Sequence, residues 1–214
     1  MKIVETNLYQ LKNDTPFVYG DALTMKTARL LNVLEVKTDS GITGWGDWGE
    51  STYFDKPAVT PQDYDPLLES LDGRDPADRA PIYAGFASGA GIPTGLLSAL
   101  DTALWDITAK RAGLSLSNLL GGRFREDAPV YASLQSYRED YADAIEWILK
   151  LVEQALAHGF RQAKIKIGGL SIDDDIECIA QVKQMMSRQA GMYELPLAVD
   201  SNCTHSLEQA VRIG

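Results

Sequence analysis

Cysteine, histidine and clustered positive charge are scarce in this sequence, and each scarcity narrows the range of possible functions. The 214 residues include two cysteines and two histidines. Cys178 and Cys203 have neither the spacing of a metal-binding finger nor that of a disulfide framework, so we expect two plain thiols. A catalytic or metal-binding role, if the chain has one, must therefore rest on other side chains.

The chain also lacks a basic cluster and a long apolar run. Its 20 Lys and Arg against 30 Asp and Glu give a formal net charge of -10, which argues against binding to nucleic acid or to an anionic membrane surface. No apolar run approaches the length of a membrane span, and the first residues alternate instead of forming a signal segment. We expect a cytoplasmic protein, and a hydrophobic content of 45% allows a sizeable core.

The first fifty residues alternate between apolar and polar side chains, as strands do. Three such stretches cover residues 2–11, 29–39 and 42–50, and the letters "DSG" between the last two predict a tight turn. This pattern is typical of an antiparallel meander.

Two stretches interrupt the alternation and predict loops that are longer than a hairpin needs. The first covers residues 13–27 and contains Pro16 and Gly20, and the second covers residues 49–61. Loops of this length more often cover a binding site than merely connect strands.

Between residues 62 and 122 the apolar residues recur at the spacing of an α-helix. In the clearest segment Pro93 begins a helix and Gly113 ends it. Five apolar residues form one stripe along this helix: Leu96, Leu97, Leu100, Leu104 and Ile107.

Strands and helices alternate from residue 128 onward. We expect strands at 128–134, 161–168 and 195–201, with helices at 141–158, at 173–188 and from 206, and this order is typical of a parallel sheet covered by helices. Three consecutive aspartates, Asp173 to Asp175, fall in the first turn of the second helix, where carboxylates interact favourably with the helix dipole.

The stretch "KIKIG" places two lysines in an apparently buried strand. Side chains two residues apart share a face, so Lys164 and Lys166 point to one side and the intervening isoleucines to the other. If the isoleucines pack under helices, the ammonium groups face the other side of the sheet, where they need a counter-charge or an anionic ligand. Repulsion between them favours loss of one proton, and a free amine is a base.

Asp200 closes the next strand at its carboxyl end, where α/β proteins keep their active sites. Its carboxylate could simply pair with the lysines, or it could bind a divalent cation such as magnesium. Asn202, two residues further on, could donate a hydrogen bond to a ligand, or it could form a turn or a helix cap.

Taken together, these motifs resemble the enolase superfamily in its mandelate racemase and muconate-lactonizing branch. The resemblance rests on "GWGD" followed after one residue by "GES", then "SALDTALWDITAKRAGLSLSNLLGG", "VYAS", "KIKIG" and "AVDSN", in this order. It implies an α+β capping domain followed by an α/β modified TIM barrel, with magnesium at the barrel mouth. It also implies abstraction of the proton next to a substrate carboxylate, which gives an enediolate, and sites of this superfamily use a Lys or His base with magnesium.

The resemblance also implies roles for individual residues. Lys166 is similar to the acid or base that moves the proton, Lys164 to its electrostatic neighbour, and Asp200 to the first magnesium ligand. Candidate substrate contacts are Asn202, Ser133, Gln135, Tyr19, Trp48 and Tyr53. The last three lie in or beside the two predicted loops, and their alternative role is packing against the rim of the barrel.

On this basis residues 1–122 would form the capping domain and residues 123–214 an incomplete barrel with only its first three βα units. A TIM barrel has eight such units, and neither further metal carboxylates nor a second acid or base follow Asp200. His158 and His205 do not fit that second role, because both lie at expected helix ends. We therefore expect the amino-terminal portion of an enzyme, inactive by itself.

The parent enzyme is expected to be a lyase or isomerase that acts on a small carboxylate, first of all a dehydratase of sugar acids, and to form a homo-oligomer. A racemase, an epimerase or a cycloisomerase of the same superfamily is the alternative. A hypothesis of another class is a non-catalytic interaction module, because three strands cannot close a barrel.

Overall fold

The computed structural model describes residues 1–49, 64–87, 94–140, 142–190 and 196–214. These residues form two compact units, and neither is a continuous stretch of chain. The first consists of residues 1–13 and 28–126, and the second of residues 14–27 and 127–214.

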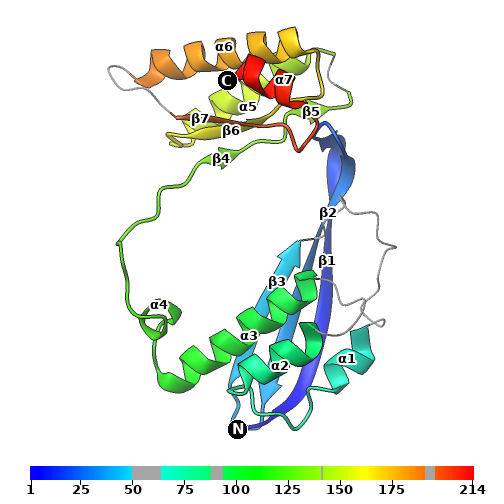
Figure 1. Ribbon diagram of the computed structural model, residues 1–214, viewed down its shortest axis with the longest axis vertical. Helices are drawn as coiled ribbons and strands as arrows, with labels where there is room; N and C mark the ends of the chain where they lie inside the picture. Colours follow the sequence, from blue (N-terminus) through cyan, green and yellow to red (C-terminus); the bar gives the residue numbers. More distant parts are fainter. Residues whose placement is uncertain (50–63, 88–93, 141, 191–195) are drawn as a thin grey trace. The chain divides into compact units, whose positions relative to one another are not determined.

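The sheet of the first unit has the strand order β3-β2-β1 (Figure 1). Its strands are β1 (Ile3–Gly20), β2 (Met25–Thr38) and β3 (Thr43–Gly49). β2 and β3 are antiparallel with Val36 opposite Gly44, and Gly41 in the predicted turn between them has a φ of 79°. The meander predicted from the alternation of the first fifty residues is confirmed.

Helices α1 to α4 follow among the described residues of the first unit, and α3 packs directly on β3 (Figure 1). They are α1 (Asp65–Glu69), α2 (Arg79–Ala87), α3 (Thr94–Ala112) and α4 (Leu116–Leu119). A Cβ atom on Gly46 would lie 1.9 Å from the backbone oxygen of Ala99, and one on Gly44 would lie 2.2 Å from that of Ala103. The two glycines of "GWGD" therefore allow the backbone of α3 to approach the strand.

The predicted apolar stripe of α3 forms a large part of the core of the first unit. All five of its residues are buried, together with Leu34 and Val36 of β2 and Ile82 of α2. The helix ends where predicted, because Gly113 adopts a φ of 66°.

The second unit contains a parallel sheet with the strand order β4-β6-β7 (Figure 1). Its strands are β4 (Ala132–Ser133), β6 (Ala163–Lys166) and β7 (Leu197–Asp200). Its helices are α5 (Ala144–Ala157), α6 (Ile172–Ala190) and α7 (Leu207–Ile213). The predicted alternation of strands and helices is confirmed, although β4 is much shorter than expected.

One face of this parallel sheet packs against α5 and α6. Ile165 and Ile167 are fully or almost fully buried against Val152 of α5 and against Cys178 and Val182 of α6. The neighbouring lysines of the same strand therefore point to the opposite face, as their spacing predicts.

The loop predicted at residues 13–27 is wrong, because these residues form the tip of a hairpin. β1 continues to Gly20 and β2 begins at Met25, and the carboxylate of Asp21 accepts hydrogen bonds from the N–H groups of Leu23 and Thr24 in the turn between them.

A short strand of the second unit fixes the hairpin tip. In β5 (Tyr137–Arg138), Arg138 lies opposite Tyr19 of β1. The guanidinium of Arg138 lies 3.8 Å from the ring centre of Phe17, and that ring packs edge-on against Trp147 of α5 at 6.0 Å. Aromatic and cation–π contacts thus attach residues 14–27 to the second unit.

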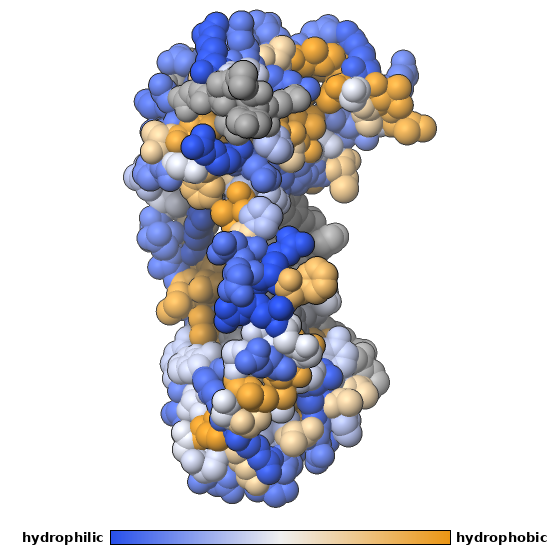
Figure 2. Space-filling view, turned by 90° about the vertical axis from the view of Figure 1, so that its left-hand side faces the viewer, coloured by the Kyte–Doolittle hydropathy of each residue, from blue (hydrophilic) through white to orange (hydrophobic). Residues whose placement is uncertain are grey.

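On the face shown in Figure 2, most of the surface is polar, with smaller apolar groups between the polar residues. Within the part of the chain that the structure describes, no helix is both long and apolar enough to cross a membrane. Several large apolar side chains are exposed nonetheless, among them Phe124, Leu207 and Val211.

Candidate active site

Lys164, Lys166 and Asp200 converge on the face of the parallel sheet that is opposite to α5 and α6. Lys166 of β6 lies directly opposite Asp200 of β7 in the parallel register. The Nζ atoms of Lys166 and Lys164 lie 2.6 Å and 3.0 Å from the same carboxylate oxygen, Oδ2 of Asp200. The convergence that the sequence predicts is confirmed, and so is the ion pair that the spacing also allowed.

The three charged groups differ in exposure. Lys166 is 7% exposed, whereas the side chains of Lys164 and Asp200 keep 20% and 31% of their surface. The hydrogen bond from Lys166 contributes most to a pKa of Asp200 well below its ordinary value, and the N–H of Asn202 and the ammonium of Lys164 act in the same direction. Asp200 is therefore an anion at neutral pH.

Asn202 forms the turn that its position allowed, and its hydrogen bond to a ligand stays a prediction. It adopts a left-handed φ of 49° in the turn after β7, and its N–H donates to Oδ1 of Asp200 at 3.0 Å. Its side-chain oxygen accepts a hydrogen bond from Nζ of Lys166 at 2.7 Å. The turn thus brings an amide into the cluster around Lys166.

Ser133 and Gln135 lie at the carboxyl end of β4, beside this cluster. Ser133 is exposed and lies opposite Lys164 in the parallel register, so the two side chains point to the same face of the sheet. The side-chain oxygen of Gln135 is buried and has no hydrogen-bond partner among the described residues. Ser133 therefore shares the face of the lysine cluster, and the contact of both residues with a substrate stays a prediction.

The three aromatic candidates have different outcomes. Tyr19 lies in β1 instead of a loop, is 7% exposed and packs edge-on against Phe17. Trp48 lies in β3 of the first unit, directly before the second predicted loop, and its indole packs against Gly95 and the core of that unit. Tyr53 lies outside the described residues. Tyr19 and Trp48 therefore pack against residues of their own units, and neither the substrate contact nor the packing against a barrel rim is tested.

Four further side chains support the end of β6 and do not figure among the predicted site residues. The Oγ atom of Ser136 accepts the N–H of Lys166 at 2.5 Å, and the hydroxyl of Tyr137 accepts the N–H of Gly169 at 2.9 Å. Asp175 accepts the N–H of Gly168 at 2.8 Å and lies 3.5 Å from the imidazole of His205. The backbone that follows Lys166 is thus held from both sides.

A sequence signal exists for Asp175. It lies in phase with Cys178, Val182 and Met186 at helical spacing, and all four residues are buried. A carboxylate on the apolar stripe of a helix predicts a buried group, whereas the run of three aspartates suggests only a charged helix end.

The described residues supply one candidate ligand for magnesium. Among them, no group of three or more His, Cys, Asp or Glu side chains is arranged to hold a metal ion. Asp200 offers the hard oxygen that magnesium prefers, on an exposed edge of the cluster. Its chemistry fits the ion, and further ligands are needed to complete a site.

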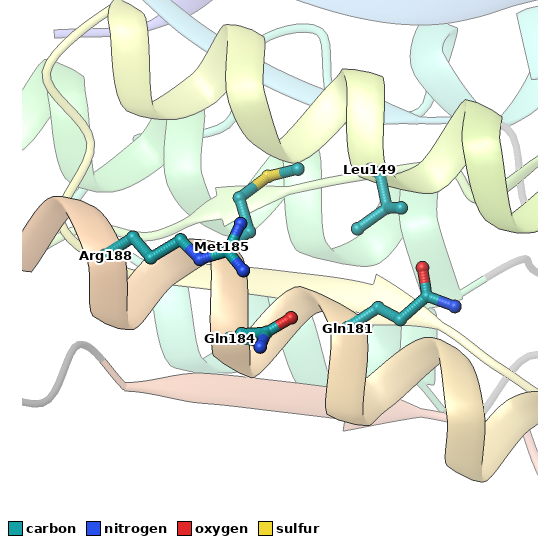
Figure 3. A pocket seen from close by; sticks show the side chains of 5 residues that line it. All are labelled: Leu149, Gln181, Gln184, Met185 and Arg188. Carbon is teal, nitrogen blue, oxygen red and sulfur yellow. The ribbon is translucent and has the colours of Figure 1, made fainter.

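A groove of about 330 Å³ lies elsewhere, on the outer side of the helices (Figure 3). Leu149 of α5 and Gln181, Gln184, Met185 and Arg188 of α6 line it. None of the predicted site residues belongs to it, so the groove and the lysine cluster are separate features.

The comparison with known proteins identifies the family. Residues 6–121 match the N-terminal domain of mandelate racemase / muconate lactonizing enzyme. The chain therefore belongs to this family, within the enolase superfamily, and its first part has the α+β capping fold of that family.

Two curated relatives cover different shares of the chain. D-galactarolactone cycloisomerase from Agrobacterium fabrum is 33% identical over all of this chain and 55% of its own length. L-talarate/galactarate dehydratase from Salmonella typhimurium is 32% identical over 69% of this chain and 36% of its own length. The chain thus spans about half, or less, of the length of these relatives.

Solved structures agree on the fold. The L-talarate/galactarate dehydratase from Salmonella typhimurium, liganded with Mg and L-lyxarohydroxamate, superimposes with a TM-score of 0.80 and 25% identity, over all of this chain and 55% of its own. The L-Ala-D/L-Glu epimerase from Bacillus subtilis gives 0.81 and 22%, over all of this chain and 57% of its own, which indicates a shared fold only.

Proposed function

We propose that this chain carries part of the active site of a magnesium-dependent enzyme that removes the proton next to a substrate carboxylate. The observation that carries the proposal is the convergence of Lys164, Lys166 and Asp200 at the carboxyl ends of β6 and β7. The proton to be removed is weakly acidic, so a base and nearby positive charge are both needed.

Lys166 is the proposed base or acid, and Lys164 its electrostatic neighbour. Nζ of Lys166 donates hydrogen bonds to Asp200 and Asn202. As an ammonium it can give up a proton, and it can accept one only after it has lost a proton and its lone pair faces the substrate. The ammonium of Lys164 lies on the same face, where a positive charge favours an anionic substrate and the enediolate formed from it. Ser133, Gln135 and Asn202 are the proposed substrate contacts.

Magnesium fits this arrangement through Asp200. Bound magnesium would take the Asp200 carboxylate as one ligand and supply positive charge beside the substrate carboxylate. The remaining ligands would come from residues other than those described. Relatives whose structures are liganded with Mg, such as the Salmonella dehydratase, support this part of the proposal.

The proposed substrates are sugar acids, and the first proposed reaction is dehydration. Support comes from the dehydratase relative, whose name gives talarate and galactarate as substrates. A cycloisomerase is the second candidate, because D-galactarolactone cycloisomerase matches along the whole chain. Racemisation or epimerisation starts with the same proton removal and remains within the proposal.

The organisation of the parent protein is also part of the proposal. Residues 1–122 would form the capping domain and residues 123–214 the first three βα units of a TIM-like barrel, completed by further units. We expect the complete protein to be a homo-oligomer of the cytoplasm. A non-catalytic module is the rival hypothesis, and the experiment below separates the two.

The test uses the complete protein that contains this chain. It measures by NMR how fast the substrate α-proton exchanges with solvent deuterium. Galactarate and L-talarate are the probes, with magnesium present. We expect exchange in the unaltered protein and a loss of about a thousandfold or more in Lys166→Met. Lys183→Met, on the exposed side of α6, is the matched control and should keep the rate. Exchange that survives in Lys166→Met would contradict the role of this lysine, and no exchange in any form would favour the module.

A further inference from the structure

The three consecutive aspartates at the start of α6 have three different surroundings. Asp173 pairs with Arg212 of α7 at the surface. Asp174 forms hydrogen bonds with Ser171 through its N–H and its carboxylate, which caps the helix. Asp175 is 1% exposed and turns away from solvent. All three lie in the first turn of α6 as expected, but a place at the helix end does not explain why Asp175 is buried.

The carboxylate of Asp175 is incompletely satisfied in its buried position. Oδ2 accepts the N–H of Gly168 at 2.8 Å and lies 3.5 Å from Nε2 of His205, whose side chain is 9% exposed. Oδ1 is buried and has no hydrogen-bond partner among the described residues. Burying a carboxylate in this way costs free energy, and such a group in a native structure calls for an explanation.

The two contacts of Asp175 lie on the two turns that follow the site strands. Gly168 comes two residues after Lys166, and His205 comes three residues after Asn202. The turns also pack tightly, since a Cβ on Gly168, which has a φ of 90°, would lie 2.1 Å from Oγ1 of Thr204. Asp200 is held opposite Lys166 by the parallel register, whereas Asn202 lies in the turn itself, so the contact between the turns bears on where the Asn202 amide meets the Lys166 ammonium.

We propose that Asp175, through His205, is a positioning residue that ties the turn after β7 to the turn after β6 and so aligns Lys166 with Asp200 and Asn202. The proposal deepens the proposed function and rests on it. Asp175 does not touch the reacting atoms, because it binds the backbone behind the lysine. Ser136 and Tyr137 hold the same backbone from the β4 side, so Asp175 and His205 supply the support on the β7 side.

The decisive variant is Asp175→Asn in the complete protein. The side-chain oxygen of an asparagine can still accept the hydrogen bond from the N–H of Gly168. The neutral amide, however, removes the negative charge that faces the imidazole of His205. We expect kcat for α-proton exchange of galactarate to fall by about tenfold or more while KM changes by less than about threefold, because alignment and not binding is lost. Asp173→Asn is the matched control on the exposed side of the same turn and should leave both constants unchanged.

A second measurement does not depend on activity. The NMR signal of the Lys166 ammonium reports directly on its hydrogen bonds with Asp200 and Asn202. We expect this signal to shift or broaden in Asp175→Asn and in His205→Ala, and to remain unchanged in Asp173→Asn. If the unaltered protein exchanges no α-proton, the proposed function fails while this signal still tests the positioning role.

The outcomes separate clearly. An unaltered Lys166 signal in both Asp175→Asn and His205→Ala would overturn the proposal, whatever the enzyme does. A fall in kcat that only follows a lower folded fraction, measured by thermal unfolding of the same samples, would overturn it as well. A shifted signal and a lower kcat in a fully folded Asp175→Asn protein would establish it.

Discussion

The carboxylate of Asp200 lies between two ammonium groups, and this arrangement gives it a defined pH signature. Its pKa in the folded protein is lowered, first by the hydrogen bond from Lys166. The stabilisation that results is fully present above the ordinary carboxylate pKa of about 3.9. It is lost as the pH falls from there towards the lower pKa of the folded state.

We therefore expect Asp200→Asn to lower the free energy of unfolding at pH 7 by about 1–2 kcal/mol, because both lysines lose their anion. The difference in free energy of unfolding from the unaltered protein should shrink below about pH 4, because the stabilisation by the ionised carboxylate decreases there. Denaturant unfolding of both proteins at pH 7 and pH 3 measures this. A difference that is the same at both values would contradict the ion-pair role of Asp200.

Asp175 should behave in the opposite way. Burial raises its pKa above the ordinary value, although the N–H of Gly168 and His205 act in the other direction. A raised pKa of an acid means that stability is lost as the pH rises through it. Asp175→Asn is therefore expected to unfold at an equal or higher temperature than the unaltered protein at pH 7, with the gain absent near pH 3. A clear loss of thermal stability at pH 7 would show that the charge supports the fold.

The strand positions of the site could be predicted from sequence, but its supporting contacts could not. The period of two in "KIKIG" fixes which side chains share a face, and Asp200 ends the next strand, so their meeting follows from the topology of a parallel sheet. The contacts of Ser136, Tyr137 and His205 depend on turn conformations. Asn202 has a positive φ, and the sequence does not indicate this because the position is not a glycine.

The contact between α3 and β3 depends on the absence of side chains at two strand positions. A Cβ on Gly46 would overlap the backbone of Ala99, which cannot move away without shifting the helix. We expect Gly46→Ala to lower the free energy of unfolding by about 3 kcal/mol, as overpacking of a core contact does.

Gly49→Ala is the matched control for this contact, in the same strand. A Cβ at Gly49 would meet no atom of the described residues within 4 Å. The change should alter stability by less than about 0.5 kcal/mol. Equal effects of the two variants in denaturant unfolding would mean that close approach of α3 is not what requires glycine in "GWGD".

Helices and strands with a clear period were predicted well, whereas the hairpin tip was not. For the apolar stripe of α3 and the isoleucines of β6, the spacing along the sequence is enough to predict which side chains are buried. Residues 13–27 contain a proline and a glycine, which normally end a strand, yet here the side chain of Asp21 closes a short turn and β5 pairs with the strand end. That partner lies far along the chain, and such pairing is invisible to local patterns.

Magnesium binding by the 214 residues alone is expected to be weak. Among the described residues only Asp200 lies in the cluster as a carboxylate ligand, and it is paired with two lysines. We expect no saturable binding in isothermal titration below about 1 mM magnesium, since tight sites need several oxygen ligands. We also expect no α-proton exchange by this chain alone. Tight binding or exchange would refute the idea that further ligands are required.

The hairpin tip at residues 14–27 belongs with residues 127–214, and this has a consequence during synthesis. During synthesis, residues 14–27 leave the ribosome long before Tyr137, Arg138 and Trp147 are made. Phe17 therefore lacks its packing partners in the second unit at a stage when most of the first unit has been synthesised. Proteolytic or genetic separation at a single peptide bond cannot divide the two units cleanly, because either fragment would lose a strand that the other one holds.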